Sequence, residues 1–123
     1  MSKAKIISVD APLIVPMPFS RKYRLERVLE VSYTFKNETM NIKVPEGYLT
    51  DGATIPKVFW SVIGSPYLPE YITAAIVHDW CCDEKYDVEE MSDLFFELLK
   101  LSNVPNLTAK LMRKAVYAYK SRY

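Results

Sequence analysis

Apolar and polar residues alternate over the first half of the chain. Between residues 23 and 35 the apolar side chains fall mainly on odd positions, with Arg27 as an interruption, which predicts a half-buried strand. The same alternation returns over residues 40–44, after a polar turn at residues 37–38. We therefore predict an antiparallel β-hairpin. Three prolines before residue 20 predict that residues 1–20 form an extended N-terminal arm rather than a regular element.

The second half of the chain changes to helical spacing. Asp87, with Glu90 three residues later, indicates an N-cap at the start of one helix. The spacing predicts helices over residues 57–63, 69–84, 87–101 and 107–119. We expect an α+β fold in a single domain, 1–123, in which a small antiparallel sheet is followed by three to four helices. Because only a few residues separate 69–84 from 87–101, these two should form a central antiparallel helical hairpin.

Composition removes several classes of function. The formal net charge of +1 argues against bulk attraction to nucleic acid, and no apolar run approaches the ~20 residues of a membrane span. No apolar segment follows the basic N-terminus, so we expect no signal peptide and synthesis in the cytoplasm of the cell that makes the protein. Cys81 and Cys82 are adjacent, which predicts free thiols; the spacing of a zinc site is absent.

The candidate chemistry centres on the single histidine of the chain. His78 is followed directly by Asp79, in the middle of an apolar helical pattern. Counting outwards from a turn at residues 85–86 places Asp93 opposite His78 on the neighbouring helix. A carboxylate on one ring nitrogen would make His78 a general base, and Asp79 could hold a hard cation such as Ca²⁺. Alternatively, the three residues form a buried network that specifies packing.

The segment around His78 resembles the catalytic helix pair of the phospholipase A2 family. The run Ala-Ala-x-x-His-Asp-x-Cys-Cys, beginning at Ala74, is similar to the family motif Cys-Cys-x-x-His-Asp-x-Cys-Tyr, and Asp93-x-x-Phe96 follows on the next helix. Cys82 stands where the family has a tyrosine. The resemblance implies that His78 activates the attacking water, Asp79 binds calcium and Asp93 orients the histidine. The region that precedes the helix contains one glycine, Gly64, where that family has a glycine-rich calcium loop.

A second resemblance covers residues 44–100. The motifs Val-Pro-x-Gly at 44–47, Thr-Asp-Gly-Ala-Thr-Ile-Pro at 50–56, Ala-Ala-x-x-His-Asp at 74–79 and Asp-x-x-Phe at 93–96 are similar to an uncharacterised family of small proteins. Its members are encoded mostly by tailed bacteriophages and prophages. This resemblance implies a virion component, an assembly factor or a lysis-stage enzyme.

The loop at residues 50–56 carries the last candidate, Asp51. It could serve as a second metal ligand with Asp79, or it could bond to His78 and tie the sheet to the helices. Our leading expectation is a virion-associated tail, connector or assembly module that binds other phage structural proteins, with a His/Asp cluster linking this loop to the helical hairpin. The alternative is a calcium-dependent lipolytic hydrolase that acts on phospholipid with His78 and Asp93 as catalytic residues. No other cofactor is implied.

Overall fold

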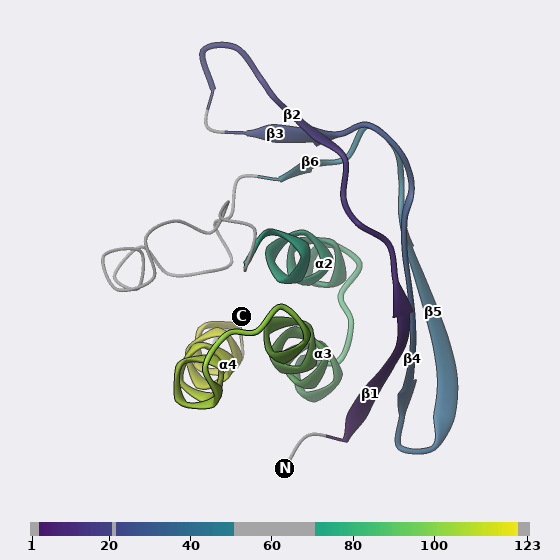
Figure 1. The fold of residues 1–123 in the computed structure, drawn as a ribbon, viewed down its shortest axis with the longest axis vertical. Helices are drawn as coiled ribbons and strands as arrows, with labels where there is room; N and C mark the ends of the chain where they lie inside the picture. The colour runs from purple at the N-terminus through teal and green to yellow at the C-terminus, as the bar shows by residue number, and fades with distance from the viewer. Residues whose placement is uncertain (1–2, 21, 51–70, 121–123) are drawn as a thin grey trace.

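The computed structural model describes residues 3–20, 22–50 and 71–120, and in it a three-stranded antiparallel sheet forms the wall on which the helices pack (Figure 1). Its strands are β1 (Ala4–Val9), β4 (Leu29–Phe35) and β5 (Glu38–Val44), in the spatial order β1-β4-β5. Every second residue of β4 faces the helices, so the alternation in the sequence marks the buried face. The buried residues of β4 are Leu29, Val31, Tyr33 and Phe35.

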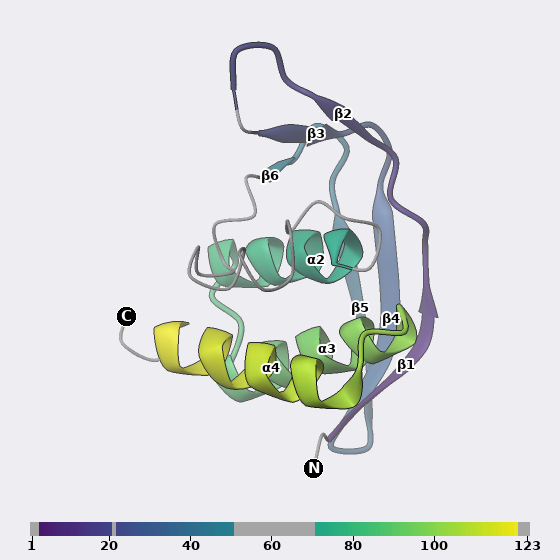
Figure 2. The ribbon, with the colours of Figure 1, turned by 60° about the vertical axis from the view of Figure 1, so that its left-hand side comes forward.

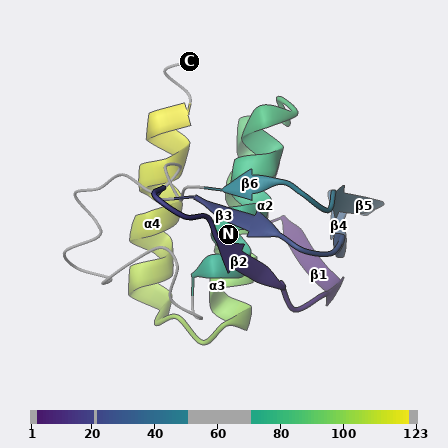
Figure 3. The same ribbon diagram turned by 90° about the horizontal axis from the view of Figure 1, so that it is seen from above.

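A second antiparallel sheet lies over α2, and Figure 3 shows its three strands side by side, seen from above. Its strands are β2 (Ile14–Pro16), β3 (Tyr23–Leu25) and β6 (Leu49–Thr50), in the order β2-β3-β6. The first twenty residues are therefore not an irregular arm, since they supply β1 and β2. Prolines do not prevent this, because Pro16 ends a short strand at the edge of its sheet, where a missing N–H is tolerated.

The single strand predicted over residues 23–35 is divided between the two sheets. β3 ends at Leu25 and β4 begins at Leu29. Arg27 occupies a position that a continuous strand would bury, and its guanidinium instead donates to the Ala11 carbonyl at 3.0 Å on the exposed surface. Since a buried unpaired cation is costly, the chain leaves the strand at this point.

The β4–β5 hairpin closes through Lys36 and Asn37, one residue earlier than predicted. Both have positive φ, 51° and 68°, as a two-residue turn that matches the right-handed twist of the strands requires. The register then pairs Phe35 with Glu38 and Leu29 with Val44. The predicted strand at residues 40–44 is confirmed as part of β5.

Three helices follow in the described part of the chain: α2 (Ile72–Asp83), α3 (Val88–Leu101) and α4 (Asn106–Lys120). The α+β class is confirmed, and α2 and α3 form the expected antiparallel pair. The predicted helix at residues 57–63 lies outside the described residues. None of the helices in the described ranges is both long and apolar enough to cross a membrane.

The helices are held by caps and by a shared core. The Asp87 side chain accepts a hydrogen bond from the Glu90 N–H at 3.1 Å, which confirms the predicted N-cap of α3. α3 lies between β1 and α4, and α2 lies between the second sheet and α3 (Figures 1 and 2). α3 is therefore covered on several sides, which explains why eight of its residues are buried: Met91, Ser92, Asp93, Leu94, Phe95, Phe96, Leu98 and Leu99.

Candidate functional site

His78 lies inside the protein rather than at its surface. Its side chain is only 2% exposed, on the face of α2 that packs against α3. The imidazole packs against the Phe95 ring, with a centroid distance of 5.1 Å and an interplanar angle of 58°. On the same face one turn later, the Cys82 Sγ lies 3.6 Å from the His78 Nδ1. The histidine is therefore held by packing as much as by polar contacts.

Asp93 is paired with an arginine, so the predicted pairing with His78 is wrong. Its Oδ1 accepts hydrogen bonds from Nε of Arg113, at 2.8 Å, and from Nη2 of the same guanidinium. Its Oδ2 accepts from the backbone N–H of Lys3 at 3.1 Å. The carboxylate is 1% exposed, and it joins the start of β1, α3 and α4 at one point. This arrangement holds three elements together.

The register of the helical hairpin explains the difference. His78 faces Phe95, and Cys82 faces Met91, so both pairs are equidistant from a point between Tyr86 and Asp87. The centre of the turn therefore lies one residue later than the predicted centre at residues 85–86. Residues two apart on a helix point about 200° away from each other. Because Phe95 faces α2, Asp93 faces α4 and β1.

Asp79 belongs to a second polar junction, between α2 and the segment that leads into β6. It is 7% exposed, and its Oδ2 accepts a hydrogen bond from the Thr50 Oγ1. Nearby, the Tyr48 hydroxyl donates to Oδ2 of Asp83 at 2.6 Å. The Tyr48 ring also meets Trp80 edge to face, with centroids 5.4 Å apart. Burial and the hydrogen bond to Asp83 raise the pKa of Tyr48, which keeps it a neutral donor.

The predicted calcium site involves Asp79 and Asp51. Asp51, the second expected ligand, lies outside the described residues. Among the residues that are described, no three His, Cys, Asp or Glu side chains gather closely enough to hold a metal ion. Thr50, the first residue of the predicted linking loop, does contact the helical hairpin through Asp79. The catalytic and calcium-binding roles of His78, Asp79 and Asp93 stay predictions.

Several residues that shape these junctions were not singled out from the sequence. They include Arg113 of α4, which donates to Asp93, and Met91 of α3, which contacts Cys82. Tyr33 bridges the sheet to α3, because its hydroxyl donates to Oε2 of Glu90 at 2.5 Å. The spacing of Asp93 and Arg113 gives no local signal, since the two residues come from different helices. Long-range pairs of this kind depend on the tertiary register.

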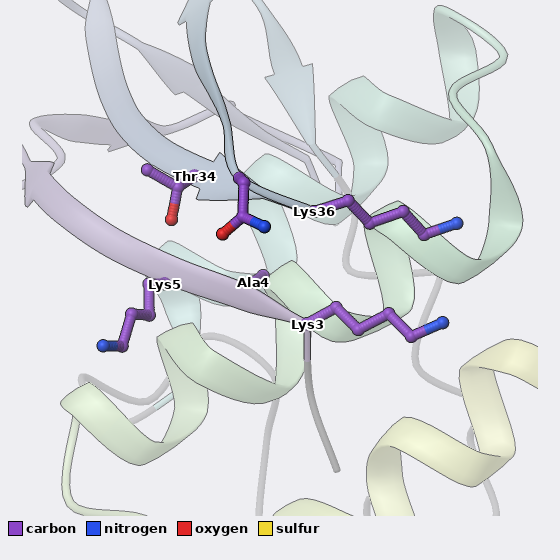
Figure 4. Close-up of a pocket in the computed structure, with 6 residues that line it drawn as sticks. Lys3, Ala4, Lys5, Thr34 and Lys36 are labelled. Carbon is purple, nitrogen blue, oxygen red and sulfur yellow. The ribbon is translucent and has the colours of Figure 1, made fainter.

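An open pocket lies beside the β4–β5 turn and the start of β1 (Figure 4). The side chains of Lys3 and Lys36 extend to one side of it and that of Lys5 to the other, so the three ammonium groups do not converge. Lys3 is also paired with Oε1 of Glu89 at 3.0 Å. The pocket therefore lacks the convergent donors that an anion site needs. It is lined by Lys3, Ala4, Lys5, Thr34, Lys36 and Asn37.

The fold and the junctions define a small α+β domain whose central polar residues are internal. Residues 27–116 match the model of the family described as a protein of unknown function, DUF1353, and the chain belongs to that family. It is similar to two uncharacterized proteins of Sinorhizobium fredii, y4jT and y4iH. The identities are 38% over 77 residues and 39% over 75 residues, or 62% and 60% of this chain. The matches cover 23% and 31% of those longer relatives. No solved structure matches.

Proposed function

We propose that this protein is an assembly module that works through contacts with other proteins, and that its His/Asp residues serve the fold. One observation carries the proposal: His78, Asp79 and Asp93 are all buried, and Asp79 and Asp93 are occupied by internal partners. A general base must reach a substrate proton within hydrogen-bond distance. At 2% exposure, the His78 ring contacts the protein interior and not a surface that a substrate reaches.

The outer face of the second sheet supplies a surface for such contacts. The register places Val15 opposite Arg24 and Arg24 opposite Leu49, so these three side chains share one face. Val15 and Leu49 are 37% and 44% exposed. At the tip of the β2–β3 connection, Phe19 is fully exposed and has a φ of 58°. A surface that combines exposed apolar side chains with an arginine has a composition typical of protein interfaces.

The resemblance to phage-encoded proteins supports a place for this module in a tailed phage particle, as a tail, connector or assembly component. The two relatives of Sinorhizobium fredii are consistent with modular use, because the matched region is a minor part of each. In that setting the partners are other structural proteins of the particle, met after synthesis in the host cytoplasm.

The test is incorporation into particles. Phage carrying Val15→Lys together with Leu49→Lys should assemble with much less of this protein than wild-type phage, measured by immunoblot of purified particles. Ile7→Lys together with Thr39→Lys is the matched control, because it also adds two lysines at exposed strand positions, but in the other sheet. Equal incorporation of all the variants would contradict this surface as the point of contact.

The enzyme alternative predicts a different result. A phospholipase A2-like hydrolase would release fatty acid from mixed phospholipid vesicles, and release would require both calcium and His78. We expect no release by wild type or by His78→Ala, with calcium or with chelator. Calcium-dependent release that is abolished in His78→Ala would favour the hydrolase and overturn the proposed function.

A further inference from the structure

Three potential metal-ligating atoms, two of them soft sulfur atoms, lie near one another at the junction of α2 and α3. The Cys82 Sγ lies 3.6 Å from the His78 Nδ1 and 3.6 Å from the Met91 Sδ. His78 and Cys82 are one helical turn apart on α2, and Met91 reaches them from the first turn of α3. The helix register places these donors together without any loop. We propose that this trio binds a soft monovalent d¹⁰ ion, of which Cu(I) is the biological example.

The spacing suits a three-coordinate ion. With bonds of about 2.0 Å to nitrogen and about 2.3 Å to sulfur, donors in a trigonal plane lie about 3.7 Å apart for nitrogen and sulfur and about 4.0 Å apart for two sulfurs. The two distances from the Cys82 Sγ, both 3.6 Å, are slightly shorter than these spacings. Rotation of the His78 and Met91 side chains would let an ion bound to the Cys82 Sγ reach the other two donors, while the two helices keep their positions.

The donor types select the class of ion. Thiolate and thioether sulfur favour Cu(I) over harder divalent ions, and imidazole is compatible with it. Met91 would be a poor ligand for Ca²⁺ or Mg²⁺, which require oxygen. This site is therefore distinct from the calcium site expected at Asp79 and Asp51, and it does not depend on the proposed protein contacts.

Burial sets the charge of the ion. His78 and Met91 are 2% and 1% exposed, whereas Cys82 is partly exposed and provides an approach from solvent. On binding, the Cys82 thiol releases its proton to solvent and the thiolate bonds to the ion. One thiolate and one monovalent cation give a neutral centre. A divalent ion would leave an uncompensated buried charge, which is costly.

The experiment is an anaerobic Cu(I) titration of the whole protein against a chromophoric chelator. We expect one equivalent to bind, with X-ray absorption showing two sulfur neighbours and one nitrogen neighbour. Cys82→Ser and Met91→Leu should each weaken binding by about tenfold or more. Met91→Leu nearly conserves volume, so it removes the donor while leaving the core filled.

Two matched controls remove the same chemistry elsewhere. Cys81→Ser changes the adjacent thiol, and Met112→Leu changes another buried methionine, in α4; both should retain wild-type affinity. Wild-type binding by Cys82→Ser and Met91→Leu would overturn the proposal. So would loss of binding in Cys81→Ser alone, or a preference for Zn²⁺ over Cu(I) in direct competition.

Discussion

At the scale of single residues, the protein uses its buried charges as ties between elements. Asp93 illustrates this most clearly, since one carboxylate receives Arg113 from α4 and the Lys3 backbone from the start of β1. Removing one member of a buried ion pair is costly because the other loses its partner. The cost is moderated here because the Arg113 side chain is 31% exposed and can regain water.

We therefore predict that Asp93→Asn lowers the free energy of unfolding by about 2–4 kcal/mol, measured by denaturant titration. Glu89→Gln is the matched control. Glu89 is on the same helix as Asp93, and the substitution removes the charge from its exposed ion pair with Lys3. That change should cost less than about 1 kcal/mol. Similar small costs for both variants would show that Asp93 does not hold the three elements together.

The stability of the fold should depend on pH through the buried groups Cys81 and Tyr33. Burial raises the pKa of both groups above their ordinary values of 9.0 and 10.0, and the hydrogen bond to Glu90 adds to the effect on Tyr33. Each group is therefore neutral in the folded protein at a pH where it ionises in the unfolded chain. Their contribution to stability is complete below pH 9 and is lost as pH rises through the raised values.

The free energy of unfolding should accordingly fall above about pH 9, by about 1.4 kcal/mol per pH unit for each group that ionises only when unfolded. Denaturant titrations between pH 8 and pH 11 measure the slope. Cys81→Ala should remove the part that begins near the ordinary thiol pKa. An unchanged slope in that variant would mean that Cys81 ionises equally in both states.

At the scale of elements, local pattern and tertiary register contribute differently. The alternation of Leu29, Val31, Tyr33 and Phe35 identified the buried face of β4, and Asp87 identified the start of α3, because both signals depend on neighbouring residues. The second sheet could not be predicted in the same way. Its strands are two or three residues long, and pairing Tyr23 with Thr50 requires contacts between distant segments.

The β4–β5 turn offers a test at this scale. Lys36 and Asn37 both adopt positive φ, which costs energy for residues that carry a Cβ. Asn37→Gly should raise the free energy of unfolding by about 0.5–1 kcal/mol, because glycine is the residue most favoured at the second central position of this kind of turn. Asn37→Val should lower it, since a β-branched residue resists this conformation. A stabilising valine would contradict the assigned turn.

At the scale of the whole molecule, two polar junctions organise the domain. One joins β1, α3 and α4 through Asp93, and the other joins the β6 region to α2 through Asp79 and Tyr48. The sequence identified His78, Asp79 and Asp93 as unusual residues but paired Asp93 with the wrong partner. A shift of one residue in the turn centre was enough to exchange Asp93 for Phe95 opposite the imidazole.

The most direct test of the central claim is the free energy of unfolding of His78→Ala, measured by denaturant titration in the presence of a chelator so that no bound ion contributes. If the imidazole is a packed structural element between Phe95 and Cys82, its removal should cost about 3 kcal/mol or more. A change of less than about 0.5 kcal/mol, accompanied by loss of a calcium-dependent lipolytic activity, would contradict the claim and make His78 a catalytic residue.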